Sequence, residues 1–503
     1  MGKWKVFLFY ITLFLLIFAY TINANNYDFD LWARLIAGMG VIDGGHVLKE
    51  DFLSYTPVHT WWDHEWGSGV IFYFFLKFFG PNSLLFLQAF LFFGIFFIIS
   101  KILKLKTKIS PYNILFYFFA IMALMFNFNQ PVRCHMFSFL LFTLFIYILE
   151  LSRKGNNKPL FLIPIIILFW NNIHGGVVAG LGLIGMFALG EFLNKKPVKK
   201  YILTIISSIA VMFINPWGYD YIKFLLMANT MERTHVMEWW GLFSKFYFAK
   251  IIIFKVFMFA MLIIESISIY KDIKLDTIKN WYKNADKVKY IILLSTLYLA
   301  FTHIKLIPFF VIASCCYIYE DFYKLIEKVN MPKWKDKVVY SLILAISVLT
   351  ISVKEITPPL DFNSYPVKEV EFLKINEIKG KLLVNFGLGS YASYKLYPDN
   401  LIFMDGRYEE VYYDFMIPLL KKFYLVNEGW DEILIKYTPD CMIIENYYPV
   451  YNVLQESKDW NLVYEGPVFG VFLPSNKPKT DYKNPSDDIR YYKNTLFNTS
   501  IKF

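Results

Sequence analysis

Apolar segments that approach the thickness of a bilayer recur along the first two thirds of this 503-residue chain. A helix needs about 20 apolar residues to span the hydrocarbon core, and the pattern predicts about eleven transmembrane helices. Soluble proteins are typically about 25% charged, whereas this chain is 18% charged and 56% hydrophobic. The composition therefore excludes a disordered chain and an ordinary cytosolic enzyme. The predicted segments are 5–22, 82–99, 111–127, 135–150, 159–172, 175–193, 201–214, 251–270, 290–303, 306–319 and 338–353.

The loops between these segments alternate in charge. Those on one side carry 24 Lys or Arg residues, and those on the other side carry seven. Because basic loops stay in the cytoplasm, we expect a multi-pass protein of the bacterial cytoplasmic (inner) membrane with a cytoplasmic N-terminus. Lys3 and Lys5 precede the first segment and no small-x-small cleavage site follows, so we interpret it as an uncleaved anchor. The net charge of +10 then reflects membrane topology and not nucleic-acid binding.

The last 150 residues have a different sequence pattern. Short apolar runs alternate with mixed helical stretches at 408–426 and 448–457, which is typical of a small α/β domain. We predict a transmembrane domain at 1–353, an extracytoplasmic α/β domain at 354–475 and an irregular polar tail at 476–503. The apolar runs are Lys381–Phe386, Leu401–Met404, Cys441–Ile444 and Val468–Leu473, and the four cysteines (Cys134, Cys315, Cys316, Cys441) form neither a metal spacing nor a disulfide framework.

The first outward loop, residues 23–67, carries seven acids against two bases. Asp30 lies at the membrane exit of the first span, Asp51 precedes an aromatic FLSYT, and Glu65 lies within WWDHEW. Carboxylates among aromatic rings at a membrane face are partly desolvated, which suits proton abstraction or metal binding. The alternatives are a merely solvated loop and a Trp-rich interfacial anchor. The stretch 66–80 is too short to span and is expected to be a helix in the outer interface.

Further polar residues are expected at the outer ends of the spans, where ionisable groups are candidates for function. Cations there would suit a phosphate or diphosphate leaving group. The alternatives are snorkelling for the long cationic side chains and a hydrogen bond between helices for His174. The residues are Arg133 and His135 in VRCHMFS, Asn171 and His174 in WNNIHGG, and Lys305 in HIKLIPF.

Several motifs follow one another in order: DFDLWARLIAGMGVID, EDFLSYTP, WWDHEW, VRCHMFS, WNNIHGG, NPWG, EWW, HIKLIPF and MDGRYEEVY. Together they resemble a family of polytopic bacterial membrane proteins similar to the GT-C glycosyltransferases, the relatives of protein mannosyltransferases and aminoarabinose transferases. The resemblance covers nearly the whole chain. It implies a GT-C-like α-helical membrane fold and a polyprenyl-phosphate-linked sugar as donor. In such enzymes an acid of the first outward loop activates the acceptor hydroxyl, and some members bind a divalent metal.

The resemblance also implies roles for single residues. Asp30 would be the catalytic base, and Asp51 and Glu65 its catalytic partners. Arg133 and Lys305 would meet the lipid phosphate. The predicted substrate-binding residues are Asp28, Arg34, His64, Arg133, His135, Asn171, His174 and Lys305, and a divalent metal, the one cofactor expected, would be held by Asp30, Asp51, Glu65 and His64. Arg34 stands where the family pattern has His, and Arg133-Cys134-His135 stands for its Arg-Pro-His.

The sequence therefore predicts a membrane glycosyltransferase that acts on an extracytoplasmic acceptor, a cell-envelope glycan, lipid or protein. Two alternatives stay open. One is a transporter or flippase of a lipid-linked glycan, and the other is a non-enzymatic membrane protein that binds the envelope. In the C-terminal domain, Asp405 and Arg407 beside Gly406 are expected to form a structural salt bridge in a turn rather than an acceptor contact.

Overall fold

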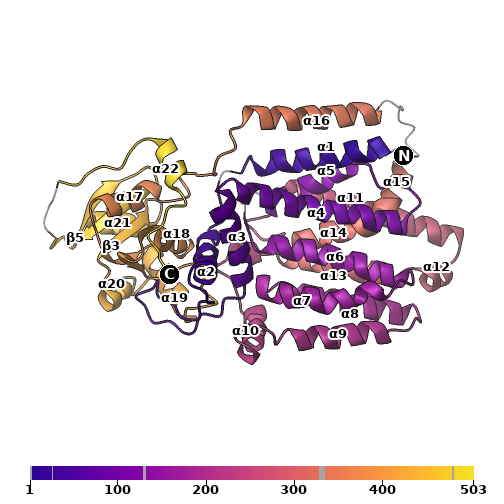
Figure 1. Cartoon of the computed structure of the whole chain (residues 1–503), viewed down its shortest axis with the longest axis horizontal. Coiled ribbons are helices and arrows are strands. Elements are labelled where there is room, and N and C mark those ends of the chain that lie inside the picture. The colour runs from indigo at the N-terminus through magenta and orange to yellow at the C-terminus, as the bar shows by residue number, and fades with distance from the viewer. Residues whose placement is uncertain (1–2, 25, 128–131, 328–334, 478–480) are drawn as a thin grey trace. The chain divides into compact units, whose positions relative to one another are not determined.

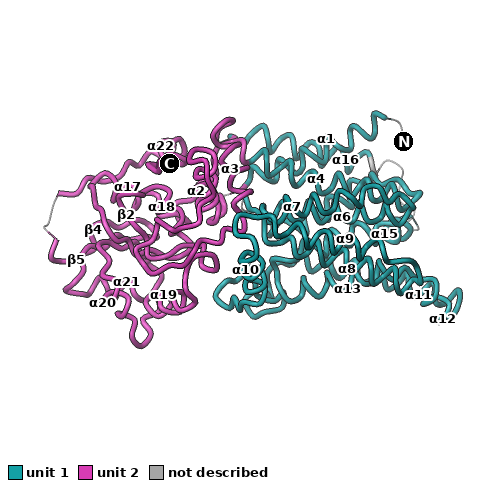
Figure 2. The backbone as a smooth tube through the Cα atoms, turned by 60° about the horizontal axis from the view of Figure 1, so that its bottom comes forward, with its two compact units in different colours: residues 1–23, 85–355 teal, residues 24–84, 356–503 magenta. Residues whose placement is uncertain are grey.

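A computed structural model of the chain describes residues 3–24, 26–127, 132–327, 335–477 and 481–503. The chain forms two compact units (Figure 2). We call residues 1–23 and 85–355 the membrane unit, and residues 24–84 and 356–503 the sheet unit. This division differs from the predicted domains, because the first outward loop belongs with the C-terminal region and not with the transmembrane helices.

Each of the eleven predicted segments forms a helix of the membrane unit, and most of these helices run side by side in Figure 1. Short 3-10 turns interrupt the chain at Met125–Asn127, Lys158–Phe161, Met237–Trp239 and Ile304–Leu306. The helices are α1 (Lys3–Thr21), α4 (Ser83–Lys106), α5 (Ile114–Leu124), α6 (His135–Arg153), α7 (Leu162–Ile173), α8 (Val177–Leu193), α9 (Lys199–Val211), α10 (Tyr219–Thr230), α11 (Ile252–Leu275), α12 (Ile278–Asn284), α13 (Lys287–Thr302), α14 (Ile307–Tyr317), α15 (Tyr319–Glu327) and α16 (Lys335–Val353).

Among the described residues, four helices are long and apolar enough to cross a membrane, namely α1, α4, α6 and α11. The pair α14 and α15, bent by 57°, makes a fifth if the two helices form one span. Large apolar side chains such as Phe90, Phe169 and Val256 face outward, as lipid contact requires. The chain is thus a multi-pass membrane protein. The total of eleven spans stays a prediction, because the other apolar helices, such as α7 (Leu162–Ile173), are shorter.

An ionic network joins the ends of three helices of the membrane unit. Arg153 of α6 pairs with Glu191 of α8 at 3.0 Å and with Asp286, the residue before α13, at 2.7 Å. Arg153 also contacts Glu150, one turn earlier on α6, at 3.0 Å. Since buried charges need several partners to offset desolvation, this network fixes how α6, α8 and α13 meet.

The sheet unit holds a five-stranded mixed sheet of order β2-β1-β3-β5-β4. The first three strands are parallel, and β5 runs antiparallel to both β3 and β4. Four of the strands match the predicted apolar runs, whereas β4 was not predicted. The strands are β1 (Gly380–Leu383), β2 (Asn400–Ile402), β3 (Cys441–Glu445), β4 (Trp460–Glu465) and β5 (Phe469–Pro474). The helices are α2 (Leu31–Ile42), α3 (Trp66–Phe79), α17 (Val367–Ile375), α18 (Phe386–Leu396), α19 (Met416–Leu425), α20 (Glu432–Tyr437), α21 (Pro449–Glu456) and α22 (Ile489–Thr495).

The first outward loop extends this sheet and packs into its core. Ser54 bridges Ile402 at the edge of β2, and Val58 bridges Tyr412. A free strand edge invites non-native pairing, and here the loop covers it. The loop also contains a helix that the sequence analysis did not predict, α2, whose residues 31–40 are all buried. The predicted irregular tail differs too, because it forms α22 and buries Tyr492.

Candidate functional site

Two glycines set the position of the helix pair that carries the first part of the candidate site. A Cβ added at Gly38 on α2 would overlap the carbonyl oxygen of Gly69 on α3, and a Cβ at Gly69 would overlap the carbonyl oxygen of Arg34. Only glycine allows such an approach between two backbones. The close crossing fixes α2, and with it the backbone of Arg34, against the segment that leads into α3.

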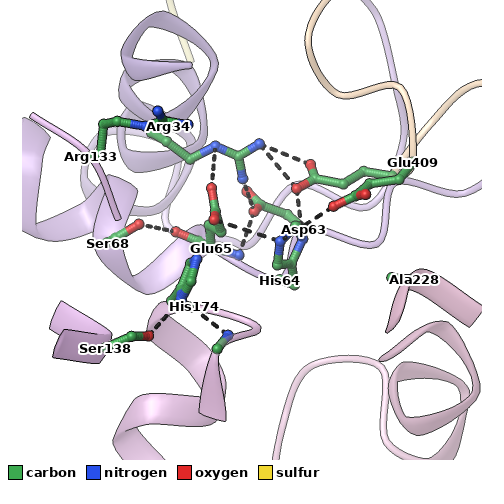
Figure 3. A network of polar contacts seen from close by, with 12 residues as sticks. Arg34, Asp63, His64, Glu65, Ser68, Arg133, Ser138, His174, Ala228 and Glu409 are labelled. Atoms are coloured by element: carbon green, nitrogen blue, oxygen red, sulfur yellow. Dashed lines mark hydrogen bonds and ion pairs between the residues drawn. The ribbon is translucent and has the colours of Figure 1, made fainter. Parts of the chain in front are cut away.

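Arg34 lies at the centre of a buried cluster of carboxylates (Figure 3). Its guanidinium pairs with Asp63, contacts Glu65 at 3.4 Å and contacts Glu410 at 3.0 Å. Only 4% of the Arg34 side chain is exposed. The planar guanidinium can hold several carboxylates at once. Arg34, which was predicted to bind substrate, therefore holds these three acids in one cluster.

His64 faces the same acids with both ring nitrogens. Its Nδ1 lies 2.8 Å from Glu410, and its Nε2 lies 3.6 Å from Glu65 and 3.8 Å from Glu409. Trp61 donates its indole N–H to Glu410 at 2.9 Å. The ligand atoms of His64, Glu65 and Glu410 all lie within 4.8 Å of one another, a separation that allows a shared metal ion.

Burial and neighbouring charges shift the pKa values of the cluster in different directions. Burial alone would lower the pKa of His64, but the carboxylates of Glu65 and Glu410 outweigh it and raise the pKa to about 9. Burial would raise the pKa of Glu410, but Arg34 and His64 lower it to about 2. Burial raises the pKa of Asp63 to about 7, although Arg34 opposes the shift. Glu410 has more donors than Asp63, so Asp63 is the acid of the pair that takes a proton.

Asp51 occupies a second cluster, in which its carboxylate is locked away from solvent. Arg407 lies 2.7 Å from Asp51 and 2.9 Å from Asp405, and the three side chains are 0% exposed. The guanidinium also stacks 4.4 Å above the ring of Trp61. The expected salt bridge between Asp405 and Arg407 is confirmed. The structure does not place Asp51 with His64 and Glu65, and its carboxylate serves as the buried counter-charge of Arg407.

Asp30, by contrast, is exposed, and it is the residue that precedes α2. Its backbone N–H donates to the carboxylate of Asp28 at 3.1 Å, and Asp28 is only 4% exposed. A Cβ placed on Gly406 would come within 2.9 Å of the Asp30 carboxylate. The carboxylate of Asp30 therefore lies against the MDGRYEEVY turn, the segment that also carries Arg407, Glu409 and Glu410.

The membrane unit holds the predicted cations. Arg133 forms a two-pronged ion pair with Glu238, one arm at 2.9 Å. Lys305 lies 5.3 Å from the centre of the Trp239 ring, and Arg233 lies 4.4 Å from the same ring. Cations over an indole face are stabilised by its quadrupole. The predicted cations thus gather around Glu238 and Trp239 of the EWW motif.

The other predicted polar residues of the membrane unit pack between helices. Ser138 on α6 lies 2.6 Å from Nδ1 of His174, the residue that ends α7. This is the hydrogen bond between helices that was one alternative for His174. Asn171 is buried and donates to the carbonyl of Met212 at 3.0 Å, and the buried ring of His135 lies 5.2 Å from Phe139.

The sequence analysis missed four acids that the structure brings to these clusters, the first of which is Asp63 on Arg34. Glu409 and Glu410 lie in MDGRYEEVY, where only Asp405 and Arg407 had been considered, and Glu238 lies in EWW. The loop itself gave no sign of Glu409 and Glu410, because Arg34 and His64 also have partners inside it, Asp63 and Glu65. Pairs separated by more than 340 residues cannot be read from local spacing.

Comparisons with known proteins bear on the fold alone. No family model and no curated protein matches the chain. The fold is similar to that of the arabinofuranosyltransferase AftD from Mycobacteria, seen by single-particle cryo-electron microscopy, with a TM-score of 0.50 and 11% identity. The match covers 95% of this chain and 40% of AftD, and a structure of an AftD mutant gives a TM-score of 0.49. This multi-pass membrane protein therefore shares its fold with part of that arabinofuranosyltransferase.

Proposed function

We propose that the chain is a membrane glycosyltransferase that moves a sugar from a polyprenyl-phosphate donor to an extracytoplasmic acceptor hydroxyl. The observation that carries the proposal is Asp30, an exposed carboxylate held at the start of a fully buried helix and set against Gly406. The likeness in fold to an arabinofuranosyltransferase supports the reaction class. The whole of AftD is longer than this chain, so donor and acceptor are part of the proposal.

In the proposed reaction Asp30 accepts the proton of the acceptor hydroxyl as that oxygen attacks the anomeric carbon of the donor. The bond between this carbon and the phosphate oxygen breaks, and the phosphate leaves with the electron pair. General-base catalysis of this kind is worth about 10²–10⁴-fold in rate. The role that the resemblance gives to Arg133 and Lys305, contact with the lipid phosphate, is a separate proposal about the membrane unit.

The transport alternative receives less support from the described residues. Two ionisable groups on the long helix α11 are already engaged within the protein. Lys255 donates to the carbonyls of Tyr247 and Phe248 at 2.6 and 2.7 Å, and Glu265 pairs with Lys289 at 2.8 Å. Side chains held in this way stabilise the bundle and do not offer a continuous polar path.

The test is a transfer assay with the purified full chain and polyprenyl-phosphate-linked pentose and hexose donors. Asp30→Asn keeps the shape of the side chain but removes the base, and it should lower the transfer rate by about 100-fold or more. Glu50→Gln, which changes an exposed acid of the same loop, is the matched control and should retain full activity. Turnover at the normal rate in Asp30→Asn would disprove the assignment of the base.

A further inference from the structure

The cluster around His64 has the arrangement of a metal-binding histidine whose second nitrogen is already held. Nδ1 of His64 lies 2.8 Å from Glu410. Glu410 is itself fixed by Arg34 at 3.0 Å and by the indole of Trp61 at 2.9 Å. Histidines that bind metals almost always have one ring nitrogen oriented by a carboxylate in this way. The ring of His64 is therefore oriented by groups that are buried and well bonded.

The other nitrogen of the ring faces two further carboxylates. Nε2 of His64 lies 3.6 Å from Glu65 and 3.8 Å from Glu409. Both separations exceed a good hydrogen bond but suit ligand atoms that share one ion. The side chains of His64, Glu65 and Glu409 are 13–16% exposed, so an ion could reach them. Figure 3 shows His64 and Glu65 with Glu409 beside them.

The charge of the cluster also leaves room for a cation. Asp63, Glu65, Glu409 and Glu410 are four carboxylates gathered around Arg34 and His64. Asp63 is 1% exposed, and its Oδ2 is buried with no hydrogen-bond partner among the residues that the structure describes. An unsatisfied buried oxygen in this group needs a further partner, and either the proton that Asp63 takes or a bound cation would supply it.

We propose that Nε2 of His64 and Glu65 bind one divalent cation and that Glu409, 3.8 Å from the same nitrogen, turns towards the ion as a third ligand. Glu410, on the other ring nitrogen, is the positioning residue that orients the His64 ring. One imidazole nitrogen with carboxylate oxygens is a ligand set that suits Mn²⁺ or Zn²⁺. The site differs from the metal set expected from the sequence. Asp51 is instead paired with Arg407, and Asp30 lies against Gly406. When bound, the cation would supply positive charge to the carboxylates around His64.

This inference does not depend on the proposed glycosyl transfer, because cation binding is measured without any donor or acceptor. The full chain is purified in detergent, stripped with a chelator and titrated with Mn²⁺ alone, and bound ion is followed by electron paramagnetic resonance. We expect one saturable Mn²⁺ per chain, with nitrogen coupling from one imidazole. His64→Gln should remove that coupling, and Glu65→Gln and Glu409→Gln should each weaken binding at least tenfold.

Asp414→Asn, an exposed acid near Glu409 in the sequence, is the matched control and should bind Mn²⁺ as the unchanged chain does. Glu410→Gln can still accept from Nδ1, so it should weaken binding less than Glu409→Gln. Tryptophan fluorescence, to which Trp61 and Trp62 contribute, checks that each variant is folded. Absence of saturable binding, bound Mn²⁺ without nitrogen coupling, or equal affinity in Glu409→Gln would each overturn the proposal. If binding is found but Asp30→Asn transfers sugar normally, the cation site stands and the proposed base does not.

Discussion

At the scale of single residues, Gly406 decides where the Asp30 carboxylate can lie. Its neighbours Asp405 and Arg407 are held by ion pairs in the fully buried group that includes Asp51. A methyl group at position 406 would come within 2.9 Å of the Asp30 carboxylate. Since the turn cannot yield, the Asp30 side chain must yield, and Gly406 positions the proposed base without touching the substrate.

Gly406→Ala should therefore reduce the turnover number more than it changes the apparent affinity for the donor. A displacement of about 1 Å at a reacting group can cost about 100-fold in rate, and we expect a loss of 10- to 100-fold in kcat in the transfer assay. Gly387→Ala is the matched control. A Cβ at Gly387 meets only one side-chain oxygen, at 4.0 Å, and full activity is expected. Equal kcat in both variants would show that Gly406 has no positioning role.

The same residues show how far sequence reasoning reaches. Asp30 and Glu65 stood out because acids beside aromatic residues at a membrane exit are unusual in composition. The partner of Asp51 did not stand out, since Arg407 is 356 positions away and a buried charge pair leaves no periodic pattern. Glu410 was missed for the same reason. Long-range pairing of charges, and not local propensity, decides which acids of the loop are buried in ion pairs.

At the scale of elements, local patterns predicted eleven helices of the membrane unit and four strands, but not α10, α12 and α15. Hydrophobic period and run length are local properties, which is why long apolar helices could be predicted. The local patterns did not predict α2. Its sequence LWARLIAGMGVI contains Arg34 and two glycines, which reads as a loop until Gly69 and Glu410 are brought against it. Tertiary contacts make this segment a buried helix, as they make Trp460–Glu465 a strand.

Helix α17 carries an acid whose burial makes the stability of the sheet unit depend on pH. Glu369 is 3% exposed, and burial raises its pKa from 4.5 to about 7. The folded state therefore binds this proton more tightly than the unfolded state does. Its stabilising effect is full below pH 4.5 and is lost as the pH rises towards 7.

Glu369→Gln has no proton to lose, so its free energy of unfolding should exceed that of the unchanged chain at pH 8 and match it near pH 4.5. Since one pKa unit corresponds to about 1.4 kcal/mol, we expect a gain of about 1–3 kcal/mol at pH 8. Denaturant unfolding of the sheet unit, followed by tryptophan fluorescence at both pH values, measures it. The exposed acid Glu428 provides the control Glu428→Gln, which should show no such gain. A gain of the same size at both pH values would show that the raised pKa of the buried Glu369 is not the cause.

At the scale of the whole molecule, the sheet unit is assembled from two stretches of chain that are separated in the sequence by residues 85–355 of the membrane unit. The C-terminal region is therefore not a separable cap on a finished site. Trp32 donates to the hydroxyl of Tyr365 at 3.0 Å, and the loop fills the edge of β2 through hydrogen bonds on both sides of Ile402. Asp30 and Asp51 therefore depend on a segment that is synthesised last.

A chain ended after residue 355 should consequently fail to fold residues 24–84, even if its helices insert. Arg34 and Asp51 would lose Glu410 and Arg407, their partners at 3.0 and 2.7 Å. Breaking a buried charge pair costs about 3–5 kcal/mol, and two are broken together with the contacts of Trp32. Limited proteolysis in membranes should cut the shortened chain within 31–79 at least tenfold faster than the full chain. Supplying residues 356–503 as a separate polypeptide should restore protection, because the buried partners return without a covalent link. If residues 31–79 were protected equally in the shortened chain, the first loop would fold by itself, and the C-terminal region would have to be regarded as an accessory rather than as part of the candidate site.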